Sequence, residues 1–481
     1  MDISAQPHGA VNFMSMLNFG FDDFDESRNE DRLRDLVASY EHSGESGYFD
    51  SDSLEDIATF YYEQSRFDDA LRVIDRVLDS QPFSSDGWMR RGILLNNLGR
   101  HEEALDAYDK TLALNPADLE TLVNRGITLD SLDRPEEAIE SYQEALRLDP
   151  ASDEALFNQG VTLERLNRLT EAISSFEKCA KANPEHPEVW YELGFCFDRG
   201  NQIEKAIEAY DRHLDVDPYS HDAWYNRGIV LNRAGRYRDA VDSYDMALVI
   251  ADDFASAYYN RGNAQANLGQ LDAAIESYKR VLELEGNDAA TSYNIALAFE
   301  EKREFRQAIT YFEQAIEADD SYAEAWYGLG CCFDAMERYD EALVFFNRAV
   351  VLSPNTADFW YAKGDCAYNL RRIGEAVSAY RTVVRLKPEN RDAWLDYAET
   401  LYEARRPEEA LDAFRRALDL KPDCASTYFR QAKAFLALGR LEEALRSIKM
   451  SFSLDPLQRE GMPDAYPELH GDPRVRAALG L

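Results

Sequence analysis

Five asparagines recur in one register of the chain and could together bind the backbone of another protein. They are spaced by 34 residues or twice that and are Asn124, Asn158, Asn226, Asn260 and Asn294. A carboxamide both donates and accepts hydrogen bonds, so a row of them can bind an extended peptide through its main chain. Glu192 occupies the one step that the row lacks.

Aromatic residues occupy the position just before this register in seven successive steps. They are Phe157, Tyr191, Tyr225, Tyr259, Tyr293, Tyr327 and Tyr361. Tyrosine is favoured at binding interfaces, so the rings are candidates for the same partner-binding surface. Packing against a neighbouring repeat would explain the rings equally well. It would not explain the amides, so the asparagines carry the stronger expectation of binding.

The same 34-residue step organises most of the chain. Prolines stand on one grid at 82, 116, 150, 184, 218, 354, 388, 422 and 456, and the empty nodes are Asp252, Gly286 and Asp320. Counting each repeat from the third residue after a node gives twelve repeats over residues 51–458. Position 20 is alanine in every repeat, position 8 is glycine or alanine, and all six tryptophans lie at position 4. Position 24 is tyrosine, phenylalanine or isoleucine.

Each repeat predicts two amphipathic helices. Positions 4, 8 and 11 form the apolar stripe of the first helix, and positions 20, 24 and 27 form that of the second. Asn-Pro or Asp-Pro then ends the second helix, because the residue before proline avoids the helical region. The exposed face of the first helix carries positions 2, 6, 9 and 13, with 5 and 12 at its edge. The asparagines at position 6 therefore lie on that face, and we expect Gly262 at position 8 to let its helix approach Ala274.

This combination of period and residue types resembles the tetratricopeptide repeat family. The resemblance implies an all-α fold, a right-handed superhelical α-solenoid of antiparallel helix pairs whose first helices line a concave groove for peptides or proteins. The asparagine row is similar to the asparagine ladder of the O-linked N-acetylglucosamine transferases, whose catalytic domain has no counterpart here. A Lys and Asn clamp for carboxylates, found in some co-chaperones of the family, is not reproduced, because position 2 is mostly acidic and position 5 aromatic.

Charge and composition narrow the partner class. The chain has 90 Asp plus Glu against 52 Lys plus Arg, a net charge of -38. Such a chain repels nucleic acid and anionic membranes and favours a neutral to cationic protein or peptide. The absence of a leader pattern and of a long apolar run predicts a cytoplasmic protein. The spacing of the histidines and cysteines indicates neither a metal site nor a cofactor.

The segments outside the repeats are short. Residues 1–27 form an acidic, aromatic tail that we expect to be disordered or to pack along the first repeat. A further hypothesis is that this tail occupies the chain's own groove. Residues 28–50 contain a capping helix, and residues 459–481 a closing segment with a short helix at 472–479. Because no room remains for a catalytic domain, we expect a non-catalytic scaffold and not an enzyme. A self-assembling array that forms homo-oligomers and a regulatory subunit of an enzyme remain alternatives. The repeat at 289–322, with Ser292 at position 4, is expected to be the least stable of the array.

Overall fold

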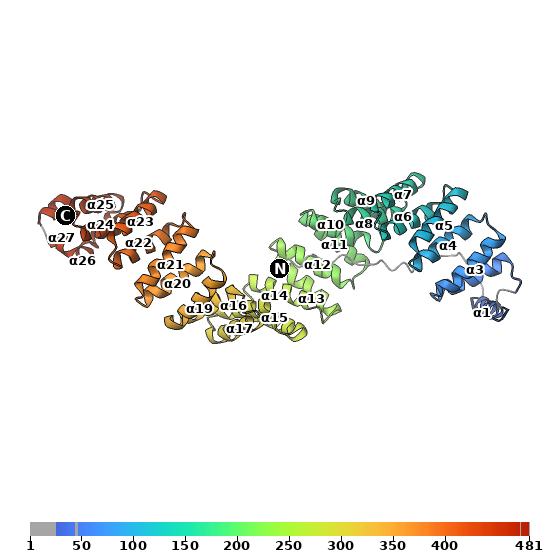
Figure 1. Ribbon diagram of the computed structural model, residues 1–481, viewed down its shortest axis with the longest axis horizontal. Helices are drawn as coiled ribbons and strands as arrows, with labels where there is room; N and C mark the ends of the chain where they lie inside the picture. The colour runs from blue at the N-terminus through green and yellow to red at the C-terminus, as the bar shows by residue number, and fades with distance from the viewer. Residues whose placement is uncertain (1–25, 44–46, 472, 481) are drawn as a thin grey trace. The chain divides into compact units, whose positions relative to one another are not determined.

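A computed structural model of the protein describes residues 26–43, 47–471 and 473–480, which contain helices and turns but no β-strand (Figure 1). The tail expected over residues 1–27 lies almost wholly outside the described residues. Each repeat forms the two predicted antiparallel helices, which confirms the all-α array of helix pairs. The first helices are α2 (Ser51–Glu63), α4 (Ser85–Asn97), α6 (Leu119–Ser131), α8 (Asp153–Arg165), α10 (Val189–Arg199), α12 (His221–Arg233), α14 (Ala255–Asn267), α16 (Ala289–Glu301), α18 (Ala323–Ala335), α20 (Ala357–Asn369), α22 (Arg391–Glu403) and α24 (Ala425–Ala437). The second helices are α3 (Phe67–Ser80), α5 (His101–Leu114), α7 (Pro135–Leu148), α9 (Leu169–Ala182), α11 (Ile203–Val216), α13 (Tyr237–Ile250), α15 (Leu271–Glu285), α17 (Phe305–Ala318), α19 (Tyr339–Leu352), α21 (Ile373–Leu386), α23 (Pro407–Leu420) and α25 (Leu441–Leu454).

The chain divides into two compact units, Met1–Phe254 and Ala255–Leu481. The division follows the first grid node that lacks proline, Asp252. The repeat at 289–322 lies inside the second unit, and its expected low stability stays a prediction.

Local signals explain where the helices begin. Ser84, Asp118 and Ser220 each accept a hydrogen bond from a backbone N–H in the first turn of the helix that follows. Such caps satisfy N–H groups that have no partner within the helix. Most second helices begin instead at an arginine that pairs with an acidic residue three positions later. The guanidinium of Arg100, for example, lies 2.6 Å from the Glu103 carboxylate.

The tryptophans hold the junctions between repeats. Each indole N–H donates to the backbone carbonyl six residues earlier, at 2.9–3.0 Å. The acceptor is usually the proline of the grid, but Trp326 donates in the same way to Asp320. The contact therefore depends on the position of the carbonyl and not on the proline side chain.

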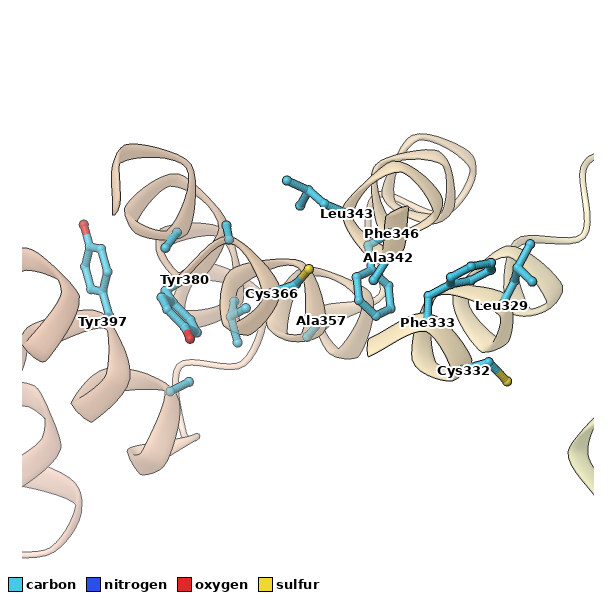
Figure 2. Packing of buried hydrophobic residues seen from close by; sticks show 14 of the residues in the cluster. Leu329, Cys332, Phe333, Ala342, Leu343, Phe346, Ala357, Cys366, Tyr380 and Tyr397 are labelled. Atoms are coloured by element: carbon cyan, nitrogen blue, oxygen red, sulfur yellow. The ribbon is translucent and has the colours of Figure 1, made fainter. Parts of the chain in front are cut away.

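Glycine at position 8 makes room for the ring at position 24. A Cβ atom on Gly262 would lie 2.6 Å from a ring carbon of Tyr278, far closer than van der Waals contact. The group that occupies this space is therefore the Tyr278 ring and not the methyl of Ala274, which corrects the expected partner. Figure 2 shows two further rings at position 24 in the same unit, Phe346 and Tyr380, which lie among buried apolar side chains.

Short helices cover both ends of the array. α1 (Glu26–Ser43) buries Val37 and packs Leu33, Leu36 and Tyr40 against the first core cluster, as the capping helix predicted. At the other end, α28 (Pro473–Leu479) lies within the segment where a short closing helix was expected. The structure adds η2 (Pro456–Arg459), α26 (Met462–Ala465) and α27 (Pro467–Gly471), which the sequence pattern did not predict.

Candidate partner-binding surface

The first helices of successive repeats lie against one another within each unit. α6 contacts α8, and α10 contacts both α8 and α12; in the second unit α18 contacts α16 and α20. Positions 5, 6, 12 and 13 lie on the sides of the first helices that meet in this way. We call the surface formed by positions 2, 6, 9 and 13, with 5 and 12 at its edge, the inner face.

The asparagine and aromatic rows are linked to each other. Asn226 donates through Nδ2 to the Tyr191 hydroxyl at 2.8 Å, and Asn294 donates to the Tyr259 hydroxyl at 3.0 Å. Each bond joins position 6 of one repeat to position 5 of the repeat before it. Tyr361 donates to the Asp396 carboxylate in the same register. These polar side chains therefore tie neighbouring first helices together.

The predicted surface residues differ in how far they are buried. Phe157, Tyr191, Tyr225 and Asn226 are buried, with Asn226 only 5% exposed. The remaining members are partly exposed, namely Asn124, Asn158, Asn260, Asn294, Tyr259, Tyr293, Tyr327 and Tyr361. The rings pack on the second helix of their own repeat, as Tyr191 does on Tyr210 with ring centroids 5.9 Å apart. Packing thus accounts for much of the aromatic row, and a binding role for the two rows stays a prediction.

Glu192, which interrupts the asparagine row, has the most unusual environment on the inner face. Burial, together with the charges of Glu164 and Glu188, raises the pKa of its carboxyl group from 4.5 to about 8. Among the described residues, no hydrogen bond or ion pair compensates this carboxyl group. Dehydration without a partner disfavours the ionised form, so at neutral pH most Glu192 side chains carry a proton.

Other carboxyl groups of the inner face share this character. Burial raises the pKa of Glu154 to about 6, assisted by the charges of Glu120 and Asp153. In the second unit, burial alone raises the pKa of both Glu300 and Asp334. Within the described residues, none of Glu154, Glu300 and Asp334 forms an ion pair.

The arginines at position 13 do not give the inner face a positive character. Arg165 lies 2.6 Å from the Asp130 carboxylate, Arg199 lies 3.0 Å from that of Glu164, and Arg233 pairs with Asp198. Each pair joins position 13 to position 12 of the preceding repeat. The pairs neutralise these arginines, and Glu154 at position 2 and Glu192 at position 6 have no ion pair among the described residues.

The described part of the chain lacks two other classes of site. No group of three or more His, Cys, Asp or Glu side chains there is placed to hold a metal ion. No described helix combines the length and the apolar character that crossing a bilayer requires.

Comparisons with known proteins agree with the repeat architecture. Two sequence profiles, both described as tetratricopeptide repeat, match the chain: one at residues 56–118, 123–187, 171–221, 197–255, 293–357, 346–390, 361–423 and 398–450, the other at 255–288. A comparison with curated proteins gave no match.

Several solved structures are similar to parts of the chain. MamA is 28% identical, with 33% of this chain and 94% of MamA covered and a TM-score of 0.33. YrrB, described as a TPR protein with an unusual peptide-binding site, is 24% identical, with 40% and 98% covered and a TM-score of 0.36. The C-terminal part of a TPR repeat-containing protein from Cytophaga hutchinsonii is 18% identical, with 49% and 97% covered and a TM-score of 0.44. With its repeats matched over most of residues 56–450, the chain belongs to the tetratricopeptide repeat family.

Proposed function

We propose that the inner face binds an extended, basic segment of a protein partner and that the protein is a non-catalytic scaffold. The observation that supports this most directly is the set of inner-face carboxyl groups without ion pairs, led by Glu192. Membership of a family that serves as interaction scaffolds supports the general function. The charge pattern supports the choice of a basic partner.

A lysine or arginine of the partner would stabilise the ionised form of these carboxyl groups. An opposite charge within about 4–6 Å favours the ionised form of a carboxyl group, so Glu192 would lose its proton as the cation arrives. Binding at pH 7 should therefore release protons to the buffer. The partly exposed amides of the same unit, such as Asn124 and Asn158, would hydrogen-bond the main chain between the cationic side chains.

A labelled peptide of alternating lysine and serine tests the basic preference by fluorescence anisotropy. Replacing both Glu188 and Glu192 by Gln should weaken binding about tenfold or more, because close charge pairs at interfaces couple by at least 1–2 kcal/mol. The matched control replaces Glu136 and Glu140 of α7 by Gln, which removes the same charge from exposed positions on a second helix. Equal losses in the two double variants would mean non-specific attraction and would contradict a site on the inner face.

A second variant set tests the amides. Replacing the partly exposed Asn124 and Asn158 by Ala should weaken the same peptide without changing how steeply its affinity falls with salt, since no charge is removed. Circular dichroism should show that the helices are intact. Unchanged affinity would remove the amide row from the proposal and leave only the carboxyl groups.

A further inference from the structure

A hollow of about 440 Å³ lies between the fourth and fifth repeats, outside the inner face. Its apolar floor is made by Ala180 of α9, by Trp190, Leu193 and Phe197 of α10 and by Ala209 of α11. We call it the Trp190 hollow. Its size falls within the range of ligand pockets, roughly 300–1,000 Å³. α10 contacts the second helices α9 and α11, and residues of all three helices line the hollow.

The hollow exists because the fifth repeat lacks the long side chain that fills this junction elsewhere. At position 7, Arg91, Arg125 and Arg227 reach across to an aspartate on the preceding second helix, with N–O distances of 2.7, 3.0 and 2.6 Å. The equivalent residue in the fifth repeat is Leu193, which is buried and too short to cross the junction. Glu177 occupies the position of those aspartates and has no arginine partner among the described residues.

Other repeats with an apolar residue at position 7 close the junction in a different way. In the eighth and ninth repeats, position 23 carries Tyr311 and Phe345, which stack on Phe299 and Trp326 with ring centroids 5.6 and 6.1 Å apart. The fifth repeat has Ala209 at position 23. Short residues at both positions leave the hollow open beside Trp190, whose ring has the guanidinium of Arg212 4.6 Å from its centroid.

The rim of the hollow carries positive charge at both ends. Lys181 lies in the last turn of α9 and Lys205 in the first turn of α11, near Trp190 and Phe197 respectively. Neither lysine forms an ion pair within the described part of the chain. Lys205 also departs from the usual pattern, because most repeats have Asp or Glu at this position. Between the ends, Glu208 pairs with Arg212 at 3.1 Å, and Glu177 also lines the hollow without an ion pair among the described residues, so that two unpaired lysines face one unpaired carboxylate.

We propose that the Trp190 hollow binds an aromatic side chain of a partner's acidic peptide segment. The ring lies beside Trp190 over the apolar floor, and carboxylates on both sides of the aromatic residue meet Lys181 and Lys205. In a chain with a net charge of -38, two unpaired lysines at the ends of an apolar hollow are complementary to an acidic segment and would repel a basic one. This site is independent of the basic segment proposed for the inner face.

The first test asks whether the hollow itself binds. The probe is a fluorescein-labelled pentapeptide, DDFDE, and its control is DDADE. The full-length protein should bind DDFDE and bind DDADE at least tenfold more weakly, since aromatic anchors dominate such interfaces. Leu193→Arg restores the residue used at this junction in other repeats, so the fold should be kept, and DDFDE binding should fall at least tenfold. Gln159→Arg makes the same change one repeat earlier and should leave the affinity unchanged.

The Leu193→Arg variant distinguishes binding in the hollow from binding by charge attraction alone. The added arginine would strengthen binding of an acidic peptide if charge alone mattered. Unchanged or tighter binding by this variant, or equal affinity for the two peptides, would overturn the proposal.

The second test addresses the two lysines. Replacing Lys181 and Lys205 by Gln should weaken DDFDE binding by about two- to fivefold for each lysine, the range of solvent-exposed ion pairs. Lys178→Gln changes an exposed lysine of α9 away from the hollow and should have no effect. An unchanged affinity in the double variant would refute the pairing with carboxylates.

DDFDE also reproduces residues 22–26 of this chain. Light scattering with and without the peptide therefore identifies the source of the segment. A particle mass that stays constant supports a separate partner as the source of the segment. A mass that falls when the peptide is added means that a second copy of the chain supplies the segment, and overturns the separate partner.

Discussion

Replacing Glu192 by Gln should stabilise the free protein at neutral pH. Glutamine has nearly the same shape as glutamate but carries no charge to be dehydrated. The wild-type carboxyl group has a pKa of about 8 in the folded chain, against an ordinary value of 4.5. The folded state therefore binds a proton that the unfolded state releases at neutral pH.

The sign and size of the effect follow from proton linkage. Because the folded pKa is raised, the stability of the wild type is unaffected below pH 4.5 and is lost progressively as the pH rises to about 8. At pH 7 the loss amounts to at most about 3 kcal/mol, since one pKa unit corresponds to about 1.4 kcal/mol. Glu192 keeps partial contact with solvent, so a gain of about 2 kcal/mol is expected for the glutamine variant.

Hydrogen exchange of the α10 amides is the appropriate assay, because repeat arrays open locally and not as one unit. Exchange in α10 should be roughly 30-fold slower in Glu192→Gln than in wild type at pH 7, and equal in the two proteins near pH 4. Glu185→Gln, an exposed position just before α10, serves as control. A difference that does not change between pH 5 and pH 8 would refute the reasoning, because a pH-independent gain would come from packing.

Three further outcomes are expected. Gly126→Ala should destabilise its repeat by about 1–3 kcal/mol in thermal denaturation, because the new methyl would lie 2.4 Å from a ring carbon of α7. The control Gly374→Ala places a methyl where no described atom lies within 4 Å, so it should be neutral or stabilising. Tyr191→Phe should cost about 1–3 kcal/mol, because the buried Asn226 loses its partner, and the cost should disappear in a background of Asn226→Ala. Cys424 should be the first cysteine that iodoacetamide alkylates at pH 7, as identified by mass spectrometry. Partial burial raises the pKa of its thiol, but hydrogen bonds from neighbouring hydroxyl groups outweigh this effect and lower the pKa to about 7.

The sequence predicted the repeats because their packing is local and periodic. The alanine at position 20, the glycine at position 8 and the aromatic residue at position 24 meet within one helix pair, so their spacing identifies both helices. Gly262 shows the limit of this reasoning. Spacing indicated a close approach of two helices, whereas only the structure showed that the Tyr278 ring occupies the space.

The candidate surface was harder to predict because its chemistry depends on neighbouring repeats. Asn226 and Tyr191 are 35 residues apart and meet only when two first helices lie side by side. Glu192 was recognised as an interruption of the asparagine row, but its raised pKa depends on burial and on Glu164 of the preceding repeat. The Trp190 hollow could have been found by comparing positions 7 and 23 across all repeats, since only the fifth combines leucine with alanine there.

The arginine that begins most second helices has a consequence for the speed of association. Pairs such as Arg134 with Glu137, whose charged groups are 2.7 Å from each other, engage many of the chain's basic side chains with an acidic residue three positions along the sequence. The excess negative charge is therefore left unbalanced over longer distances, where it acts on a partner before contact is made. A basic partner should be captured at a rate that falls steeply between 10 and 300 mM salt, while its residence time changes little. Encounter would then be governed by ionic strength, and retention by the fit of the bound segment.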